Sequence, residues 1–446
     1  MKRAFDVLVV GAGPAGLAAA HAAASHGVSV GVVDDNPLAG GQIWRGGPGR
    51  QADERARNLW ATLQAAPNVT LLHQCRVLYP LDGKRLLAQT PTDAIELHYG
   101  SLVIATGARE RLLPFPGWTL PGVTGAGGLQ ALAKGGYPVA GKRVIVAGSG
   151  PLLLAAAATL KQQGAQIAAI VEQAALPRLA RFALGLLATP SKVTQALQLA
   201  CRLRDVPYLR NSYVLSAHGS ATLQSVRLRR GDRIEQWDCD LLASGYGLLP
   251  NVELALALGC AMQEGARPVR ATQAGATRDG AGQDHRTRER AMLDYAVQVD
   301  AWQRTSVPDV LCAGEGTGVG GVDLALAEGR IAGLAAAGRT DAAPSLFAER
   351  ARWRRFAARL VHAFALRPAL AQLADDDTIV CRCEDVRHGE LRGHTSCRSA
   401  KLHTRCGMGP CQGRVCGAAT GLLYGWRPDT VRLPLSPARI GSMIEE

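Results

Sequence analysis

The stretch FDVLVVGAGPAGLAAA, residues 5–20, joins an apolar run of strand length to a glycine fingerprint and the start of an alanine-rich helix. Gly11 permits the tight turn after the strand, Gly13 lets a pyrophosphate approach the backbone, and Gly16 lets the helix pack on the strand. The helix N-terminus supplies N–H groups and a positive dipole to phosphate oxygens. This stretch therefore predicts a strand–turn–helix unit that binds a dinucleotide.

A second apolar run, residues 28–33, follows the helix and ends in Asp34, 23 residues after Gly11. An acid at this position accepts hydrogen bonds from the hydroxyl groups of a ribose. Together these segments form a βαβ unit of a parallel sheet. Two later segments suit the same site: Thr106-Gly107, at the end of a strand-like run, and Glu315, in a glycine-rich loop before a helix.

The same pattern returns at residues 143–147, an apolar run followed by Gly148-x-Gly150 and a second alanine-rich helix. Leu153 stands at the third glycine position, where it crowds the contact between helix and strand. Glu172 ends the next strand, and an acid there favours NAD or ATP over NADP. Gly148, Gly150 and Glu172 are therefore candidate cofactor-binding residues, and a purely structural second unit remains the alternative.

The order of these motifs resembles that of the glutathione-reductase-like flavoproteins with two dinucleotide-binding domains, over roughly residues 1–340. The resemblance implies FAD in the first unit, although the fingerprint alone suits ATP equally well. In that unit it implies cofactor contacts at Gly11, Gly13, Pro14, Ala15, Gly16, Asp34, Gln42, Val77, Thr106, Gly107 and Glu315.

Two departures from that family matter. The family usually has Gly-Asp where this chain has Gly314-Glu315. The segment GGQIWR, residues 40–45, stands where many members place their redox cysteines. Disulfide reductase activity is therefore not expected.

Six of the eleven cysteines crowd into 36 positions near the end of the chain, mostly in the segments VCRCE (380–384) and TRCGMGPCQGRVC (404–416). The apolar N-terminus is too short for a secretory signal, so this crowding favours a metal over disulfide bonds. Four thiolates gathered from two short turns are what a [2Fe–2S] cluster requires. The second pair of ligands is either Cys411 and Cys416 or includes Cys406, and zinc or a metal-free cluster are alternatives.

Residues 376–430 resemble the bacterioferritin-associated-ferredoxin-like (BFD-like) [2Fe–2S] domain. Their GMGPCQGRxC segment is similar to that in the large (alpha) subunits of bacterial opine, hydroxyproline and related amino-acid dehydrogenases, and of hydrogen cyanide synthase. The resemblance implies a cluster held by Cys381, Cys383, Cys411 and Cys416. It also implies that the partner is a catalytic, FAD-containing beta subunit, joined in some complexes by a small [2Fe–2S] gamma subunit.

We therefore expect an electron-transfer subunit of a hetero-oligomeric flavin-dependent dehydrogenase. The substrate would be an amino or imino acid of the D-hydroxyproline, opine, proline or glycine type, oxidised on the partner, since no catalytic residue stands out in this chain. A flavin takes two electrons and releases them singly to a one-electron cluster, which accounts for both groups in one chain. The alternatives are a self-contained NADH-dependent ferredoxin-type reductase and a non-catalytic ATP-binding scaffold.

The predicted fold class is α/β, with two nested Rossmann-like dinucleotide-binding domains and a small C-terminal BFD-like [2Fe–2S] domain. The predicted boundaries place the first part of the FAD-binding domain at 1–120 and the second, NAD-type domain at 121–247, with a helical insertion at about 176–204. The second part of the FAD-binding domain covers 248–340, a linker helix 341–375, and the [2Fe–2S] domain and tail 376–446.

Composition sets the remaining limits. The chain has 446 residues, of which 47% are hydrophobic and 20% charged, so it can bury a sizeable core. Its net charge of +13 is spread along the whole chain, without a nucleic-acid-reading motif and with only 5% aromatic residues. No apolar run reaches the roughly 18 to 20 residues of a membrane-spanning helix. A cytoplasmic protein without nucleic acid is expected, with peripheral contact at the inner face of the membrane left open.

Overall fold

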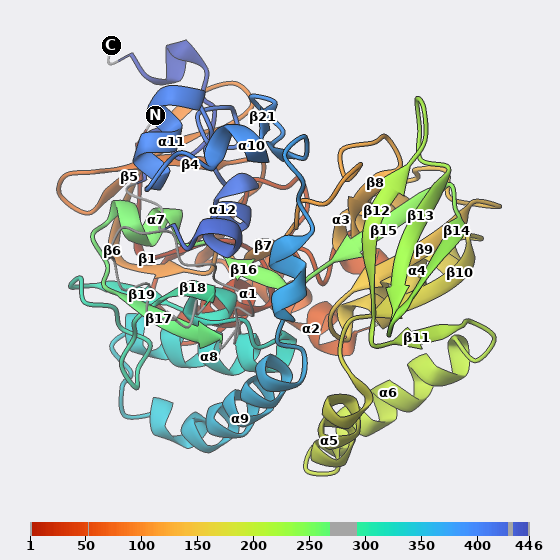
Figure 1. Cartoon of the computed structure of the whole chain (residues 1–446). Coiled ribbons are helices and arrows are strands. Elements are labelled where there is room, and N and C mark those ends of the chain that lie inside the picture. Colours follow the sequence, from red (N-terminus) through yellow and green to blue (C-terminus); the bar gives the residue numbers. More distant parts are fainter. Residues whose placement is uncertain (1, 52, 268–291, 427–430, 445–446) are drawn as a thin grey trace, which may run out of the picture.

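The computed structural model describes residues 2–51, 53–267, 292–426 and 431–444. Two dinucleotide-binding units stand side by side, and the cysteine-rich C-terminal region lies against the first of them (Figure 1). The prediction of an α/β fold with two nested Rossmann-like units is confirmed, because in each unit a glycine fingerprint follows a strand that lies between parallel neighbours. No helix in the described ranges has both the length and the apolar character needed to cross a membrane.

The first unit is built on a seven-stranded sheet in the order β3-β2-β1-β6-β5-β4, with β19 added beside β6. Strands β1, β2, β3, β6 and β19 run parallel, whereas β4 and β5 form antiparallel pairs at the edge. The strands are β1 (Lys2–Val10), β2 (Val30–Val33), β3 (Val69–Leu72), β4 (Arg76–Leu81), β5 (Arg85–Gln89), β6 (Ala94–Ile104) and β19 (Val310–Cys312).

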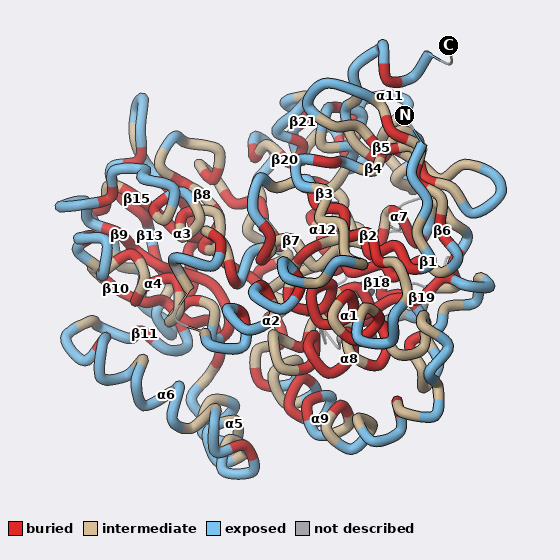
Figure 2. Tube along the Cα trace, turned by 180° about the vertical axis from the view of Figure 1, so that it is seen from behind, coloured by how far each residue is buried: buried red, intermediate tan, exposed pale blue. Residues whose placement is uncertain are grey.

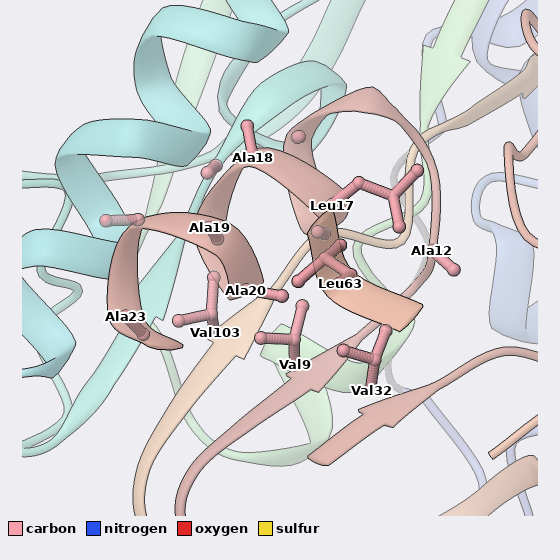
Figure 3. Close-up of a cluster of buried hydrophobic side chains, with 14 of the residues drawn as sticks. Val9, Ala12, Leu17, Ala18, Ala19, Ala20, Ala23, Val32, Leu63 and Val103 are labelled. Atoms are coloured by element: carbon pink, nitrogen blue, oxygen red, sulfur yellow. The ribbon is translucent and has the colours of Figure 1, made fainter. Parts of the chain in front are cut away.

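Helix α1 (Pro14–Ala24) packs on this sheet and against α8 (Val322–Ala336), and α2 (Glu54–Ala65) packs beside α1 in the same core. The short side chains of α1 lie over the apolar residues of the central strands (Figure 3). A Cβ on Gly329 of α8 would lie 2.2 Å from the carbonyl oxygen of Ala15, and one on Gly333 would lie 2.1 Å from that of Ala19. The two helices therefore touch backbone to backbone, which explains the alanine and glycine content of both.

The second unit has a fully parallel sheet in the order β11-β10-β9-β15-β8. Its elements are β8 (Val123–Gly125), α3 (Ala126–Lys134), β9 (Arg143–Gly148), α4 (Leu152–Gln162), β10 (Gln166–Glu172), β11 (Tyr208–Arg210) and β15 (Leu241–Gly245). An antiparallel sheet covers one face of it, formed by β12 (Ser212–His218), β13 (Ser225–Arg230) and β14 (Arg233–Asp238).

Two helices, α5 (Leu176–Leu186) and α6 (Pro190–Arg202), occupy the segment between β10 and β11. They project from the second unit, and neither has a buried residue (Figure 2). Phe182 anchors α5, since its ring contacts the rings of Phe356 and Phe364.

The two units are joined by β7 (Ala108–Glu110) and β16 (Leu248–Pro250), which pair with each other. Helix α7 (Glu253–Ala257) and the hairpin of β17 (Met262–Arg267) and β18 (Met292–Val297) follow. Short 3-10 turns lie at Pro48–Arg50, Gly314–Thr317, Ala343–Leu346, Pro368–Gln372 and Ile440–Ser442.

The segment predicted as a linker helix, residues 341–375, contains α9 (Phe347–Ala363) and then leaves helical geometry. Arg367 is extended because it precedes Pro368, and a residue before proline disfavours the α conformation. The C-terminal region follows, with β20 (Ile379–Cys381), β21 (Val386–Arg387), α10 (His388–Leu391), α11 (Cys397–Thr404) and α12 (Cys416–Tyr424).

The last described residues, 431–444, tie the C-terminal region to the first unit. The Leu435 amide donates to the carbonyl oxygen of Leu78 on β4, and Arg439 donates to the carbonyl oxygens of Thr90 and Pro91 after β5. The Gln412 side chain donates to the Pro434 carbonyl oxygen over 2.8 Å. The cysteine-bearing loop is thus linked to the sheet edge of the first unit.

Candidate functional site

The two outer glycines of the first fingerprint are required by the fold itself. Gly11 has φ +106°, and a Cβ there would lie 2.3 Å from the carbonyl oxygen of Ala105. A Cβ on Gly16 would lie 1.8 Å from the carbonyl oxygen of Gly11. Any side chain at either position would therefore push α1 away from the turn.

Gly13 differs from them because its Cβ position is open. The nearest atom to that position is the Cα of Gly41, at 3.9 Å, and Gly41 itself has φ +58°. Gly13 is the N-cap of α1, no side chain caps this helix end, and Pro14 has no N–H to satisfy. The first turn of α1 can thus offer its remaining backbone N–H groups to a phosphate.

Ala15 brings the third predicted segment to the same place. It is buried, and its Cβ lies 2.7 Å from the position that a Cβ of Gly314 would take. Gly314 precedes the predicted site residue Glu315, so the loop before α8 lies directly against the first turn of α1. The fold therefore brings two of the glycine-rich segments together.

The Asp34 carboxylate is held inside the turn. One of its oxygens accepts from the Ala12 N–H at 2.6 Å, and the other accepts from the backbone and side-chain nitrogens of Asn36, both at 2.8 Å. The Asp34 residue is only 7% exposed. This acid fixes the end of β2 against the fingerprint, and a ribose would share an oxygen that is already hydrogen-bonded.

Gln42 and Val77 lie at the edges of this region. Gln42 is exposed and accepts from Arg45 at 2.6 Å. Val77 is half-buried on β4, next to Arg76, whose Nε is 3.8 Å from the Asp35 carboxylate. The strand of Val77 therefore begins beside the acid that follows Asp34.

Thr106 and Gly107 are tied to a residue that sequence reasoning missed. The Asn251 side chain donates to the Thr106 carbonyl oxygen over 2.9 Å, and the Thr106 hydroxyl donates to the Asn251 carbonyl oxygen over 2.6 Å. The Asn251 N–H donates to the Gly107 carbonyl oxygen over 3.0 Å. Asn251 directly follows the strand that returns from the second unit, so its role depends on tertiary structure and leaves no local sequence signal.

Glu315 organises its own loop. Its carboxylate accepts from the N–H groups of Gly320 and Gly321 at 2.8 and 2.9 Å, and burial raises the pKa of Glu315. A second acid, Glu328 of α8, was not predicted. It is 1% exposed and accepts from the Gly314 N–H, the Thr317 hydroxyl and the Arg354 guanidinium, the last at 2.8 Å.

The glycine turn of the second unit is covered by other residues of the chain, whereas the position at Gly13 in the first unit is open. Gly148 has φ +149°, and a Cβ there would lie 1.8 Å from the Gly245 carbonyl oxygen. Glu172 is fully buried and accepts from the N–H groups of Gly150 and Ala174 at 2.7 and 2.8 Å. Burial raises the pKa of Glu172 to about 7. The Cβ of Gly150 would lie 3.7 Å from the ring of Phe364, so the chain itself covers this turn.

The cysteines gather in two groups. The sulfur atoms of Cys381, Cys406 and Cys416 lie within 4.8 Å of one another, and all three residues are buried. Cys383 and Cys411 form a second contact, in which the backbone and side chain of Cys411 hydrogen-bond the Cys383 thiol. Cys383 is exposed and Cys411 partly so. The structure thus brings each predicted ligand next to another and adds Cys406 to the buried group.

Cys381 is the sulfur best placed to be a thiolate. Hydrogen bonds from the Cys406 and Cys416 thiols, and then from the N–H groups of Gly407 and Glu384, lower its pKa to about 2. The same contact with Cys381 raises the pKa of Cys406 to about 12 and raises that of Cys416 further. Four hydrogen-bond donors are therefore directed at one sulfur, and a bound cation would stabilise several thiolates together.

The cysteine loop is bonded to the junction between the two units. The Arg109 guanidinium on β7 lies 2.8 Å from the Glu253 carboxylate, which is 3.7 Å from Arg414. A cavity of about 520 Å³ lies between this junction and the loop of Gly407, Met408 and Gln412. A residue two positions after the Thr106-Gly107 segment is thus in contact with the segment that bears Cys411 and Cys416.

These residues fit the groups that the sequence implies. The open position at Gly13 and the uncapped start of α1 suit a nucleotide phosphate. The clustered thiols, with N–H groups directed at one sulfur, suit iron–sulfur or zinc ligation. His388, His394 and His403 are not in the thiol group of the described residues, and stack instead on Tyr424 or on each other.

The amino-acid sequence matches one protein family and is similar to subunits of two known enzymes. The sequence model described as pyridine nucleotide-disulphide oxidoreductase matches residues 5–280. Hydrogen cyanide synthase subunit HcnB of Pseudomonas aeruginosa is 32% identical over 92% of this chain and 90% of that protein. The A subunit of opine oxidase from Rhizobium meliloti is 32% identical over 99% of this chain and 98% of that protein.

Among solved structures, L-proline dehydrogenase from P. horikoshii has a similar fold, with a TM-score of 0.69 and 18% identity. The alignment covers all of this chain and 80% of that one.

Proposed function

Since this chain belongs to the pyridine nucleotide-disulphide oxidoreductase family, we propose that it is the electron-transfer subunit of a flavin-dependent dehydrogenase that oxidises an amino or imino acid. The observation that supports this most is the group of buried thiols, whose loop is hydrogen-bonded at the Arg414 carbonyl oxygen to Arg109 in the junction between the two units. One chain thus holds a nucleotide-type site and a thiol cluster on connected segments.

In this proposal FAD binds along the first fingerprint, and it supplies two-electron acceptance with one-electron release. Gly13 and the start of α1 hold its pyrophosphate, Asp34 faces its ribose, and the Glu315 loop lies against the remainder. Cys381, Cys383, Cys411 and Cys416 hold a [2Fe–2S] cluster. The N–H groups of Gly407 and Glu384 stabilise the negative charge on the Cys381 sulfur.

Substrate oxidation is placed on a partner subunit. The two relatives at 32% identity are named as subunits, one of hydrogen cyanide synthase and one of opine oxidase. Within this chain, the buried acids of the first site are Asp34, Glu315 and Glu328, and each accepts hydrogen bonds from backbone N–H groups. Glu328 also accepts from Arg354. These hydrogen bonds give all three acids a role in holding the loops, and in this proposal a catalytic FAD-containing subunit binds the amino or imino acid.

The test is the visible spectrum of the purified chain before and after NADH and after substrate with its partner. Flavin and iron–sulfur bands that ignore NADH, but bleach with proline, hydroxyproline or an opine in the presence of the partner, support the proposal. Robust dye reduction by the isolated chain with one of these substrates would contradict it.

The second glycine fingerprint, residues 148–153, favours one alternative function, which the same spectra test. It would serve a self-contained NADH-dependent ferredoxin-type reductase, and bleaching of the flavin by NADH alone would support that function instead. A colourless protein that binds ATP would point to a non-catalytic scaffold.

A further inference from the structure

The segment after α9, residues 364–367, lies on the glycine turn of the second dinucleotide-binding unit. We infer that this unit is a socket for the chain's own linker, so that residues 364–367 take the place of a nicotinamide or adenine dinucleotide. The inference concerns the second unit only and does not rest on the proposed flavin or iron–sulfur cluster.

Phe364 covers the position where a pyrophosphate would approach the backbone. The Cβ of Gly150, which has φ +102°, would lie 3.7 Å from the Phe364 ring, and the middle glycine of such a fingerprint is the one that a pyrophosphate contacts. The Ser149 hydroxyl donates to the Phe364 carbonyl oxygen over 2.9 Å. The Phe364 ring also meets the Phe182 ring edge-on, with centroids 5.2 Å apart.

The next linker residues occupy the end of β10, where a dinucleotide would place its ribose and adenine. The Gln173 side chain donates to the Ala365 carbonyl oxygen over 3.1 Å and accepts from the Arg367 N–H at 3.2 Å. The Arg367 guanidinium donates to the Gln173 carbonyl oxygen and, over 2.7 Å, to Asn211. Ala365 is 7% exposed and Leu366 4%, as expected for residues seated in a site.

The acid of the second unit is used by the same turn. One carboxylate oxygen of Glu172 accepts from the Gly150 N–H and the other accepts from the Ala174 N–H. The Glu172 residue has no exposed surface. A ribose would have to displace one of these bonds and also the linker above it. At the third fingerprint position Leu153 is fully buried, so the helix start cannot move closer to the strand to make room.

This socket has a structural role for the C-terminal region. The linker continues through the 3-10 turn Pro368–Gln372 into β20, which begins the cysteine-rich region. Trp118 of the second unit donates to the Ile379 carbonyl oxygen over 2.6 Å, and the Arg382 guanidinium stacks on the Trp118 ring. The seated linker and Trp118 together fix where the cysteine loop stands between the two units.

Hydrogen exchange of the full-length protein with its cofactors tests the inference. We expect that millimolar NADH, or ATP in a separate run, leaves the amides of residues 149–154 unchanged. Phe364→Ala should speed exchange at the amides of residues 365–367 by about tenfold or more, because the ring that seats the linker is gone. Phe347→Ala is the matched control, since Phe347 contacts Trp302 and Arg350 at the start of α9, away from the socket.

Protection of residues 149–154 by NADH or ATP in the wild-type protein would overturn the inference. Unchanged exchange at residues 365–367 in Phe364→Ala would overturn it as well. Protection that appears only in Phe364→Ala would support it, because removing the linker's anchor would then have opened the nucleotide site. None of these readouts depends on amino-acid oxidation, so they separate this inference from the proposed function.

Discussion

Arg109 Nε donates a 3.2 Å hydrogen bond to the carbonyl oxygen of Arg414. The first residue lies two positions after Gly107 and the second two positions before Cys416. The Glu253 carboxylate lies next to both guanidinium groups, at 2.8 Å from Arg109 and 3.7 Å from Arg414. A single acid therefore holds together the predicted flavin segment and the cysteine loop.

Replacing that acid should loosen the cysteine loop. Glu253→Gln leaves two partly buried guanidinium groups without their anion, so we expect a loss of about 1 to 3 kcal/mol in the free energy of unfolding. Exchange at the amides of residues 405–415 should accelerate, and urea unfolding gives the stability change. Glu235→Gln on β14 is the control, because that acid pairs with Arg230 and Trp237 in the antiparallel sheet. Equal acceleration of exchange at residues 405–415 in the two variants would refute the role of Glu253.

The glycines of the first fingerprint should separate nucleotide binding from stability. Gly13→Val places its side chain in open space beside the start of α1, so it should remove bound nucleotide at a cost of about 1 kcal/mol from the poorer N-cap. Gly16→Ala forces a Cβ against the Gly11 carbonyl oxygen and should cost about 3 kcal/mol or more. Nucleotide content after denaturation and urea unfolding measure the two effects. Full nucleotide content in Gly13→Val would show that the site is assigned wrongly.

Serine substitutions should identify the cluster ligands. We expect loss of iron and of the reduced-state EPR signal for Cys381→Ser, Cys383→Ser, Cys411→Ser and Cys416→Ser. These sulfurs form the Cys381–Cys416 and Cys383–Cys411 contacts. Cys406→Ser should keep a nearly normal signal, and Cys201→Ser on the exposed helix α6 is the control.

The position of Cys406 makes that experiment decisive. Its sulfur lies within 4.8 Å of those of Cys381 and Cys416, so it could replace a ligand. Loss of the cluster in Cys406→Ser with retention in Cys416→Ser would shift the ligand set to Cys406 and Cys411. Retention in all five variants would show that the C-terminal region is not the iron–sulfur domain.

Glu172 should make stability depend on pH. Its native pKa of about 7 exceeds the ordinary 4.5, so between these values the native state binds more protons than the unfolded state. Stability therefore falls as pH rises through this window, by up to about 3 kcal/mol from this group. The charged and titratable neighbours of Glu172 are Arg367, Tyr208 and Tyr246. Burial raises the pKa of both tyrosines, so they stay neutral between pH 4.5 and pH 7.

Comparison with Glu172→Gln isolates this contribution. Urea unfolding at pH 5 and pH 7 should show that the wild type loses stability relative to Glu172→Gln as the pH rises. Parallel changes in the two proteins would show that Glu172 is ionised already at the lower pH.

The local parts of the fold could be predicted from the sequence. Gly11, Gly16 and Gly148 each leave no room for a Cβ beside a backbone carbonyl oxygen, so the spacing of these glycines predicts both βαβ units. The sequence predicts that Asp34 and Glu172 stand at strand ends, as they do in the structure, but it does not predict their hydrogen-bond partners. Asp34 and Glu172 each hold the N–H of their own fingerprint turn, a contact that depends on how the turn closes.

The features that sequence reasoning missed join distant segments. Asn251 lies 145 residues from Thr106, and Phe364 lies 215 residues from Ser149. No periodicity or composition marks such contacts, because each partner has an ordinary local sequence. The role of Cys406 cannot be read from the sequence for the same reason, since spacing alone does not determine which sulfurs the fold buries.

The backbone contact between α1 and α8 has a consequence for synthesis on the ribosome. Helix α1 is made early, but its partner residues Gly329 and Gly333 emerge more than 300 residues later, and strand β19 shortly before them. The second unit lies entirely between these segments, so the nascent chain can complete it while α1 still lacks α8 and β6 still lacks β19. Helix α1 is thus made well before the helix that covers it, and its apolar residues are exposed to chaperones in the meantime.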